Sequence, residues 1–287
     1  MPYSVEISRE NRALFVLLMD QSYSMEDALG GGSKKKMDEL ATVVNRQLDI
    51  MAKRATGGEG IKDWMDIGFI GYRTDQDAVP IIESPLVGDA LGGKMLASIT
   101  EIADNIGRME QRTREYYDEE AGETLTQDVQ FPVWVDAIAE GGTPMCTALN
   151  TAYEMVKNWI EDGHQGSFPP IVIHFTDGEN QEDGNPLDYA EPLKGLETND
   201  GNVLLFNCHL SEAKADEFFF PHSGEILPND YARSLFDMSS VLPDPIFDRA
   251  RSEGFEVEPG ARGMVFNADM TALIKFLDMG TRVATLR

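Results

Sequence analysis

The chain has 287 residues, which is enough for one large α/β domain or two small ones. Its 50 acidic residues against 24 basic ones give a net charge of −26, which argues against nucleic acids and anionic membrane surfaces as partners, because both attract clustered Lys and Arg. Two cysteines, Cys146 and Cys208, are too few for a disulfide framework, and the amino-terminal region lacks the basic stretch of a signal peptide, so we expect a cytoplasmic protein.

The first half of the chain predicts two buried strands and two helices. An uninterrupted apolar run at 13–19 is typical of a central parallel strand that is covered on both faces. Leu40, Val43, Val44, Leu48 and Met51 form one apolar stripe of a helix at about 38–54. Lys34, Lys35 and Lys36 lack the spacing of a phosphate-binding loop, and we interpret them as a solvated helix start. The remaining elements expected here are a strand at 64–72, an antiparallel edge strand at 79–86 and a helix at 95–109.

The second half begins with an acidic stretch at about 111–130 that has little apolar periodicity, and we expect a surface insertion there. Beyond it the sequence predicts helices at 144–160, 231–238, 245–252 and 270–279, buried strands at 170–175 and 202–210, and an edge strand at 263–267. Strands that alternate with helices indicate an α/β fold, a doubly wound and mostly parallel six-stranded sheet with one antiparallel edge strand and helices on both faces. We see no linker, so we expect 1–287 to form a single domain.

Polar side chains follow two of the buried strands at the point where each strand ends. Asp20, Ser22 and Ser24 come directly after the first strand, and Thr176 and Asp177 follow the strand at 170–175. A third segment, Gly141-Gly142-Thr143-Pro144-Met145, opens the helix before that strand. Carboxylate and hydroxyl oxygens form a hard donor set that suits Mg²⁺, Mn²⁺ or Ca²⁺ and disfavours zinc or copper. An Asx- and Ser-rich turn that only caps the first helix is the alternative reading of the first segment.

These three motifs, in this order and at these element boundaries, resemble the von Willebrand factor A (VWA) domain and its metal-ion-dependent adhesion site. The resemblance covers about 10–215, and the elements at 216–287 extend the same plan. It implies that Ser22 and Ser24 ligate a divalent ion directly, that Thr143 does so directly or through water, and that Asp20 and Asp177 act mostly through water. A metal held mainly by neutral hydroxyls stays electrophilic, so it can accept an Asp or Glu carboxylate of a partner protein as its last ligand.

Several other residues near these motifs have weaker functional readings. Asp27 matches the second-ion pattern of integrin β-subunits, whereas Ala28 departs from it and puts that second ion in doubt. We interpret His174 as a hydrogen-bonded core histidine, and His209 as a residue that could face the site from the end of a strand. Cys146 follows Thr143 closely, and a buried side chain at a helix start is the role we expect for it.

The leading functional hypothesis is a cation-dependent protein-interaction module with no catalysis of its own. The resemblance implies bacterial multi-protein assemblies, encoded with a Ser/Thr kinase and a PP2C-type phosphatase (tellurite-resistance-like systems) or with a MoxR-type ATPase, and does not choose between them. The alternative is a Mg²⁺-dependent phosphohydrolase of the haloacid-dehalogenase plan, with Asp20 as nucleophile; that family requires Asp where Ser22 stands, and a lysine near Thr176 that the sequence does not indicate. A scaffold that no longer binds metal is the third reading.

Overall fold

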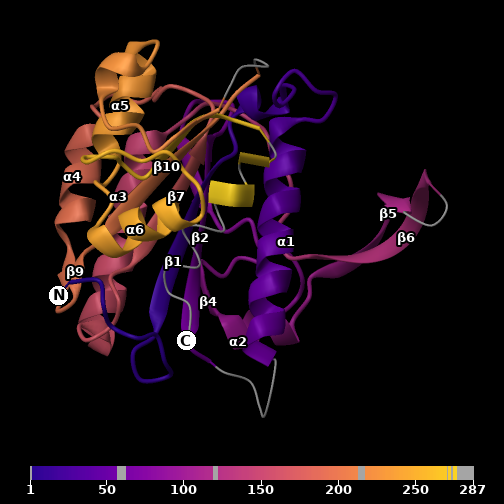
Figure 1. Ribbon diagram of the computed structural model, residues 1–287, viewed down its shortest axis with the longest axis horizontal. Helices are drawn as coiled ribbons and strands as arrows, with labels where there is room; N and C mark the ends of the chain where they lie inside the picture. Colours follow the sequence, from indigo (N-terminus) through magenta and orange to yellow (C-terminus); the bar gives the residue numbers. More distant parts are fainter. Residues whose placement is uncertain are drawn as a thin grey trace.

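A central sheet of eight strands forms the middle layer of the molecule (Figure 1). The computed structural model describes residues 2–56, 63–118, 122–212, 217–269, 271–272 and 274–276. The strand order is β11-β12-β10-β7-β1-β2-β3, and β4 pairs with the remaining part of β2. The strands of this sheet are β1 (Ala13–Asp20), β2 (Met65–Thr74), β3 (Pro80–Glu83), β4 (Leu96–Ser98), β7 (Ile171–Thr176), β10 (Leu204–Leu210), β11 (Phe218–Phe219) and β12 (Met264–Ala268).

The sheet has the order and the strand directions of a doubly wound fold. β1 runs parallel to both β2 and β7, and β10 runs parallel to β7 and β12. β3 pairs antiparallel with β2 at one edge, as the sequence predicts. The predicted fold class, the Rossmann-like architecture that the VWA resemblance implies, is therefore confirmed. Six strands match the predicted ones, while β4 and β11 are short antiparallel additions, and β11 removes β12 from the edge where the sequence placed it.

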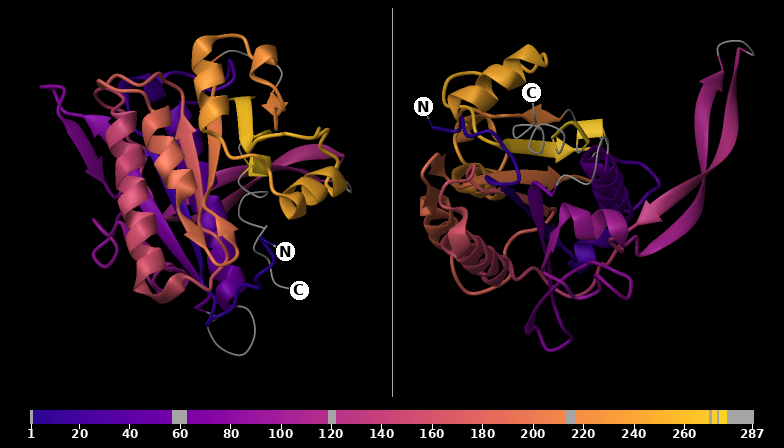
Figure 2. Two further views of the ribbon diagram at one scale, coloured as in Figure 1. Left: turned by 90° about the vertical axis from the view of Figure 1, so that its left-hand side faces the viewer. Right: turned by 90° about the horizontal axis from the view of Figure 1, so that it is seen from below.

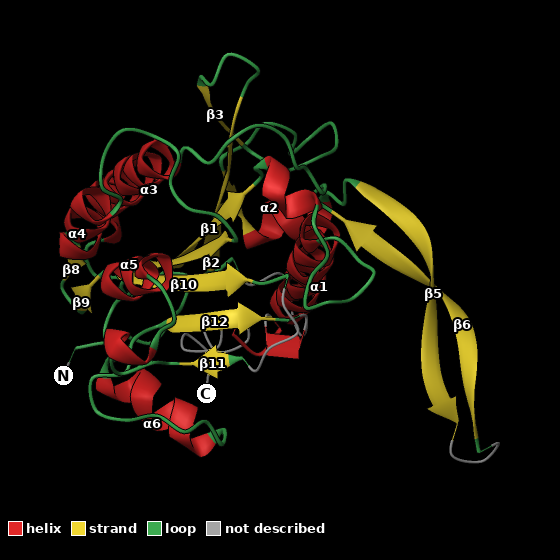
Figure 3. Cartoon of the chain, turned by 90° about the horizontal axis from the view of Figure 1, so that it is seen from above, coloured by secondary structure: helices red, strands yellow, loops and turns green. Residues whose placement is uncertain are grey.

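The helices cover both faces of the sheet (Figures 2 and 3). Along β1, Leu14, Val16 and Leu18 pack into the core beneath one set of helices, and the alternate residues Phe15 and Leu17 pack beneath the other. The first set is α3 (Met145–Trp159), α4 (Leu187–Gly195) and α5 (Asp230–Met238), and the second is α1 (Lys36–Thr56), α2 (Ile99–Asp104) and α6 (Asp244–Ser252). Burial on both faces explains why β1 carries no polar residue before Asp20.

The predicted surface insertion at 111–130 is a long antiparallel hairpin rather than a loop. Strands β5 (Arg108–Asp118) and β6 (Glu123–Val133) pair only with each other and project away from the body (Figure 3). The predicted helix at 95–109 is also wrong over most of its length, because β4, α2 and the start of β5 share those residues. Ser98 and Glu101 form a capping box that starts α2 late, so its buried residues reduce to Ile99 and Ile102.

The remaining elements are short. Strands β8 (Glu197–Thr198) and β9 (Gly201–Asn202) form a short antiparallel hairpin. Single helical turns occupy Tyr23–Glu26, Ile160–His164 and Gly224–Ile226. Half of the predicted helix at 270–279 lies outside the described residues, and the residues of it that are described, 271–272 and 274–276, are helical. In the part of the chain that the structure describes, no helix combines the length and the apolar character needed to cross a membrane.

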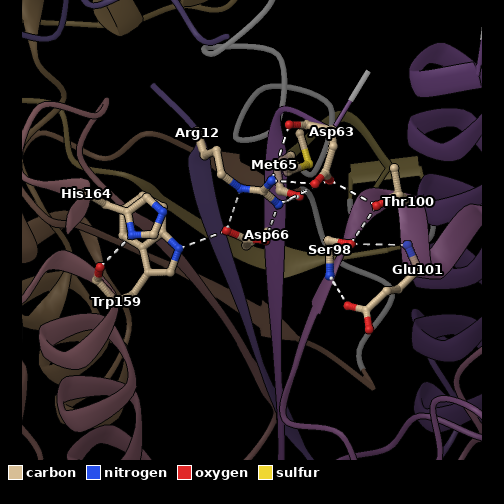
Figure 4. Close-up of polar contacts among 9 residues, drawn as sticks. All are labelled: Arg12, Asp63, Met65, Asp66, Ser98, Thr100, Glu101, Trp159 and His164. Atoms are coloured by element: carbon tan, nitrogen blue, oxygen red, sulfur yellow. Dashed lines mark hydrogen bonds and ion pairs between the residues drawn. The ribbon is translucent and has the colours of Figure 1, made fainter. Parts of the chain in front are cut away.

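A network of polar side chains joins the elements at the amino-terminal ends of β1 and β2, opposite the carboxyl ends of β1 and β7 (Figure 4). The guanidinium of Arg12, just before β1, donates to Asp63 at 2.6 Å and to Asp66 at 2.9 Å, and the indole N–H of Trp159 donates to Asp66 at 3.0 Å. The two carboxylates offset the arginine charge, and the three contacts join β1, β2 and α3. This edge is therefore anchored by ion pairs, whereas the opposite edge carries the candidate site.

Candidate metal centre

The three predicted motifs meet at the carboxyl edge of the sheet, where the strand order changes direction. β2 follows β1 on one side and β7 lies on the other, which makes this the switch point at which doubly wound folds bind ligands. Met19 and Phe175 are paired residues in the two parallel strands, so Asp20 and Thr176 leave the sheet side by side. The segment at 141–145 joins them because it starts α3, which packs against β1.

Backbone hydrogen bonds hold the loop that follows β1 against the segment that precedes α3. The N–H of Tyr23 donates to the carbonyl of Gly141 at 2.9 Å, and the N–H of Glu140 donates to the carbonyl of Gln21 at 2.7 Å. Gly141 has a φ of +65°, and a Cβ at this position would lie 2.0 Å from the carbonyl oxygen of Thr74. Both facts require glycine here. The approach of this loop to the end of β1 therefore depends on Gly141.

The side-chain oxygens of the motifs gather in one place. The hydroxyl oxygens of Ser22 and Ser24 lie 3.1 Å apart, and the Ser24 hydroxyl donates to Oδ1 of Asp177 at 2.6 Å. A Cβ on Gly178 would lie 3.3 Å from Oγ1 of Thr143 and 3.6 Å from Oγ of Ser24. The absence of a side chain at Gly178 thus keeps space open between hydroxyls from two different loops. The structure brings all five predicted residues to this edge of the sheet.

Asp20 is almost fully enclosed, with an exposed fraction of 1%. Its Oδ1 accepts the backbone N–H of Ser22 at 2.9 Å, and its Oδ2 accepts the hydroxyl of Thr176 at 2.7 Å. The pKa of Asp20 is raised to about 6, mainly by burial and in part by the nearby charge of Asp177, against the lowering effect of its hydrogen bonds. A buried carboxylate with only neutral donors gains from a cation close by, so the electrostatics of the group fit a bound divalent ion.

Lys36 is a residue of this site that the sequence analysis missed. We predicted a solvated lysine run, and Lys34 is indeed 72% exposed, but Lys36 is only 2% exposed. Its Nζ lies 2.5 Å from Oδ2 of Asp177, 3.0 Å from Oε1 of Glu212 and 3.3 Å from the carbonyl oxygen of Ser24. Lys36 precedes Leu40 by four residues, so it shares the buried face of α1, and that spacing is the signal that could have found it.

The other candidates have structural partners. His174 is buried between Tyr72 and Asn207, its ring nitrogens 2.7 and 2.8 Å from the tyrosine hydroxyl and the amide oxygen, which confirms the predicted core histidine. His209 stacks on Phe266 with ring centroids 4.4 Å apart, and its Nδ1 accepts the N–H of Asn267 at 3.3 Å.

Cys146 is buried in the first turn of α3, where burial raises the pKa of its thiol to about 11, so it is a packing residue. Glu182 accepts the backbone N–H of Thr147 at 2.8 Å and so caps this helix.

The donor set decides which ion could bind. Ser22, Ser24 and Thr143 supply neutral hydroxyls, and Asp20 and Asp177 supply carboxylates, so every donor is a hard oxygen. Over the described residues, no group of three or more His, Cys, Asp or Glu side chains is arranged to hold a metal. The arrangement is thus rich in hydroxyls and consists of hard oxygen donors, which fits Mg²⁺ or Mn²⁺.

No protein-family model matches the chain, and no curated protein matches it. Solved structures that resemble it include proximal thread matrix protein 1 (PTMP1) from the mussel byssus with a zinc-occupied MIDAS motif, at 13% identity over 98% of this chain and 49% of that one, with a TM-score of 0.43. PilB minor pilin from Streptococcus sanguinis has 12% identity, 98% and 63% coverage, and a TM-score of 0.43. Manganese-loaded Plasmodium vivax TRAP protein has 14% identity, 96% and 76% coverage, and a TM-score of 0.40. The chain spans about half the length of the PTMP1 structures.

Proposed function

We propose that this chain is a divalent-cation-dependent protein-interaction module that binds an Asp or Glu carboxylate of a partner protein through a metal ion. Ser22, Ser24 and Thr143 would hold the ion, and Asp20 and Asp177 would act around it through water. The observation that carries the proposal is the convergence of these hydroxyls and carboxylates from three separated segments, with Ser22 and Ser24 3.1 Å apart and Ser24 2.6 Å from Asp177.

The balance of charge supports binding of an acid rather than a base. Asp20, Asp177 and Lys36 together carry a charge of −1, so they would leave a divalent ion only partly neutralised and able to attract a carboxylate. Glu212, the second partner of Lys36, is 61% exposed, so solvent screens its charge. Tyr23, between the two serines, is 71% exposed and offers an aromatic surface beside the ion. Large exposed aromatic side chains are enriched at protein interfaces, and we assign Tyr23 to the contact with the partner.

We further propose Mg²⁺ as the resident ion, with Mn²⁺ or Ca²⁺ as substitutes, and one domain over 1–287 in a cytoplasmic bacterial protein. The partners we propose are a Ser/Thr kinase, a PP2C-type phosphatase or a MoxR-type ATPase, as components of a signalling, stress or defence assembly. The domain itself would carry no catalytic residues.

The phosphohydrolase alternative is disfavoured by the surroundings of Asp20. A nucleophilic carboxylate needs a free oxygen that faces the substrate, whereas both oxygens of Asp20 accept hydrogen bonds and the side chain is buried. Lys36 does reach this region, which the sequence did not indicate, but its ammonium is buried against Asp177 and Glu212.

The proposal is tested by capture of partners on the immobilised protein in bacterial extract. We expect capture with Mg²⁺, loss of capture in EDTA, and recovery when Mg²⁺ is restored. The double variant Ser22→Ala/Ser24→Ala should behave as the EDTA-treated protein does, while Ser4→Ala, at the opposite end of the molecule, serves as the control. Mn²⁺ titration by calorimetry should give binding to the native chain and none to the double variant. Capture that persists in EDTA, together with no Mn²⁺ binding, would contradict the proposal.

A further inference from the structure

Lys36 is a buried cation in direct contact with the candidate metal centre. Its Nζ lies 2.5 Å from Oδ2 of Asp177, while Oδ1 of the same carboxylate accepts the hydroxyl of Ser24 at 2.6 Å. The ammonium also lies 3.3 Å from the carbonyl oxygen of Ser24. The lysine thus occupies the second oxygen of a carboxylate whose first oxygen faces the proposed metal ligands. An ion that approaches Ser24 and Asp177 meets a positive charge that the fold already holds there.

The contacts around Lys36 fix its position. Its backbone N–H donates to the carbonyl of Asp27 at 2.9 Å, which places the start of α1 directly behind the Ser24 turn. On the other side, the N–H groups of Gly30 and Gly31 donate to the carbonyls of Ser211 and Glu212, both at 2.7 Å. These bonds place Ser211 and Glu212, which follow β10, against Gly30 and Gly31. The carboxylate of Glu212 thereby lies 3.0 Å from the ammonium of Lys36. Lys36 therefore stands between the metal centre and a second loop of the same edge.

The charge of this lysine has two opposite effects on the site. Without it, Asp20 and Asp177 would be two enclosed carboxylates at one edge of the sheet, and their mutual repulsion would oppose the assembled arrangement. With it, the Asp177 charge is neutralised before any ion arrives, so a divalent ion gains less from that carboxylate and is repelled by the ammonium. Glu212 compensates only weakly, because its side chain is 61% exposed and its charge is screened by solvent.

We propose that Lys36 is a tethered cation that lowers the affinity of the centre for divalent metal and keeps its loops assembled when no metal is bound. This inference rests on the function proposed above, since it concerns the affinity of the same site. When the ion binds, its attraction for Asp177 weakens the hold of that carboxylate on the ammonium, and Glu212 is the partner that remains for Lys36. Metal loading is thereby linked to the contact between α1 and the loop after β10.

The test compares Lys36→Met with Lys35→Met, which removes the same charge from the neighbouring residue of the same lysine run. Lys35 pairs with Glu26 at 2.5 Å instead of with Asp177, so it controls for the change in net charge. Mn²⁺ affinity is measured by calorimetry on the native chain and on both variants. We expect Lys36→Met to bind Mn²⁺ about tenfold more tightly than the native chain, and Lys35→Met to stay within about twofold of it.

A second measurement uses the metal-free proteins. In EDTA, the urea midpoint of Lys36→Met should fall below that of the native chain, and saturating Mn²⁺ should recover it; Lys35→Met should show neither change. Lys36→Gln, which keeps an N–H donor for Asp177 but no charge, replaces Lys36→Met if the latter does not fold, and the same gain in affinity is expected.

An unchanged or weaker Mn²⁺ affinity for the Lys36 variants overturns this inference. The proposed function would then still stand if Ser22→Ala/Ser24→Ala abolishes Mn²⁺ binding. Conversely, if the native chain binds no Mn²⁺ while Lys36→Met does, the lysine inference is supported and the proposed function is overturned. If the metal-free midpoint of Lys36→Met equals that of the native chain, the assembling role of Lys36 is wrong whatever the metal titrations give.

Discussion

Replacement of Asp177 by asparagine in the metal-free protein measures how strongly the candidate site depends on its internal ion pair. The variant Asp177→Asn keeps the volume and an acceptor for the Ser24 hydroxyl, but it leaves the ammonium of Lys36 without its buried counter-charge. Both side chains are almost fully enclosed, at 0% and 2% exposure. Loss of one member of a buried pair costs about 3–5 kcal/mol, because the remaining charge stays in a medium that solvates it poorly.

The remaining contact with Glu212 lowers that figure only slightly, since this carboxylate is largely in solvent, so we expect Asp177→Asn to lose about 3 kcal/mol of unfolding free energy. Lys36→Met should lose a similar amount, because it leaves Asp177 unpaired beside Asp20. The double variant Lys36→Met/Asp177→Asn should then lose about 3 kcal/mol less than the sum of the single losses.

Urea unfolding in EDTA, with the slope compared among the four proteins, gives the three differences. A coupling free energy below about 0.5 kcal/mol would refute the claim that Lys36 and Asp177 stabilise the site as a pair.

Three further outcomes follow from the structure. Gly141→Ala should lose at least about 2 kcal/mol of unfolding free energy and most Mn²⁺ binding, because the new Cβ would meet the Thr74 carbonyl. The control Gly163→Ala, also at positive φ but in open space, should lose about 1 kcal/mol and keep its Mn²⁺ affinity. Urea unfolding measures the stability of both variants, and calorimetry measures their Mn²⁺ affinity. Burial lowers the pKa of His174 from 6.5 to about 4, so the unfolded chain takes up the proton first as the pH falls. The free energy of unfolding that depends on neutral His174 should therefore be fully present above pH 6.5 and fall by about 2 kcal/mol at pH 5. The variant His174→Gln should not show this pH dependence in unfolding experiments. Tyr23→Ala should weaken partner capture and leave Mn²⁺ affinity unchanged, and a loss of Mn²⁺ affinity would show that it supports the ion rather than the partner.

The sequence predicted the parts of the fold in which local pattern and burial agree. The apolar runs at 13–19, 170–175 and 202–210 correspond closely to β1, β7 and β10, because strands covered on both faces must be apolar throughout. Two of the three motif loops were predictable for the same reason, because their polar residues begin where the runs at 13–19 and 170–175 end, whereas the segment at 141–145 was predictable from its glycines and Thr143 at the start of a predicted helix. That the loops approach one another follows from the parallel order of β1 and β7.

The β5–β6 hairpin could not be predicted from periodicity. Apart from the buried end of β6, this two-stranded ribbon lies outside the core and has no buried face, so its sequence shows no alternation of apolar and polar residues, and its many charges are typical of a loop. The burial of Lys36 was missed for a different reason. A run of three lysines was interpreted as one solvated unit, although the helical spacing separates Lys36 from the other two.

The outer hairpin has a consequence for the behaviour of the protein at high concentration. Both of its edges carry unpaired backbone N–H and carbonyl groups, the kind of border to which a strand of another molecule can attach. Along one face, Glu110 bridges Arg108 and Arg112, and across the other, Gln111 and Thr113 donate to Asp128. A strand of another molecule that paired with this hairpin would have to desolvate these polar and charged side chains. The polar side chains that leave the hairpin without a strand pattern in the sequence therefore also protect it from polymerising.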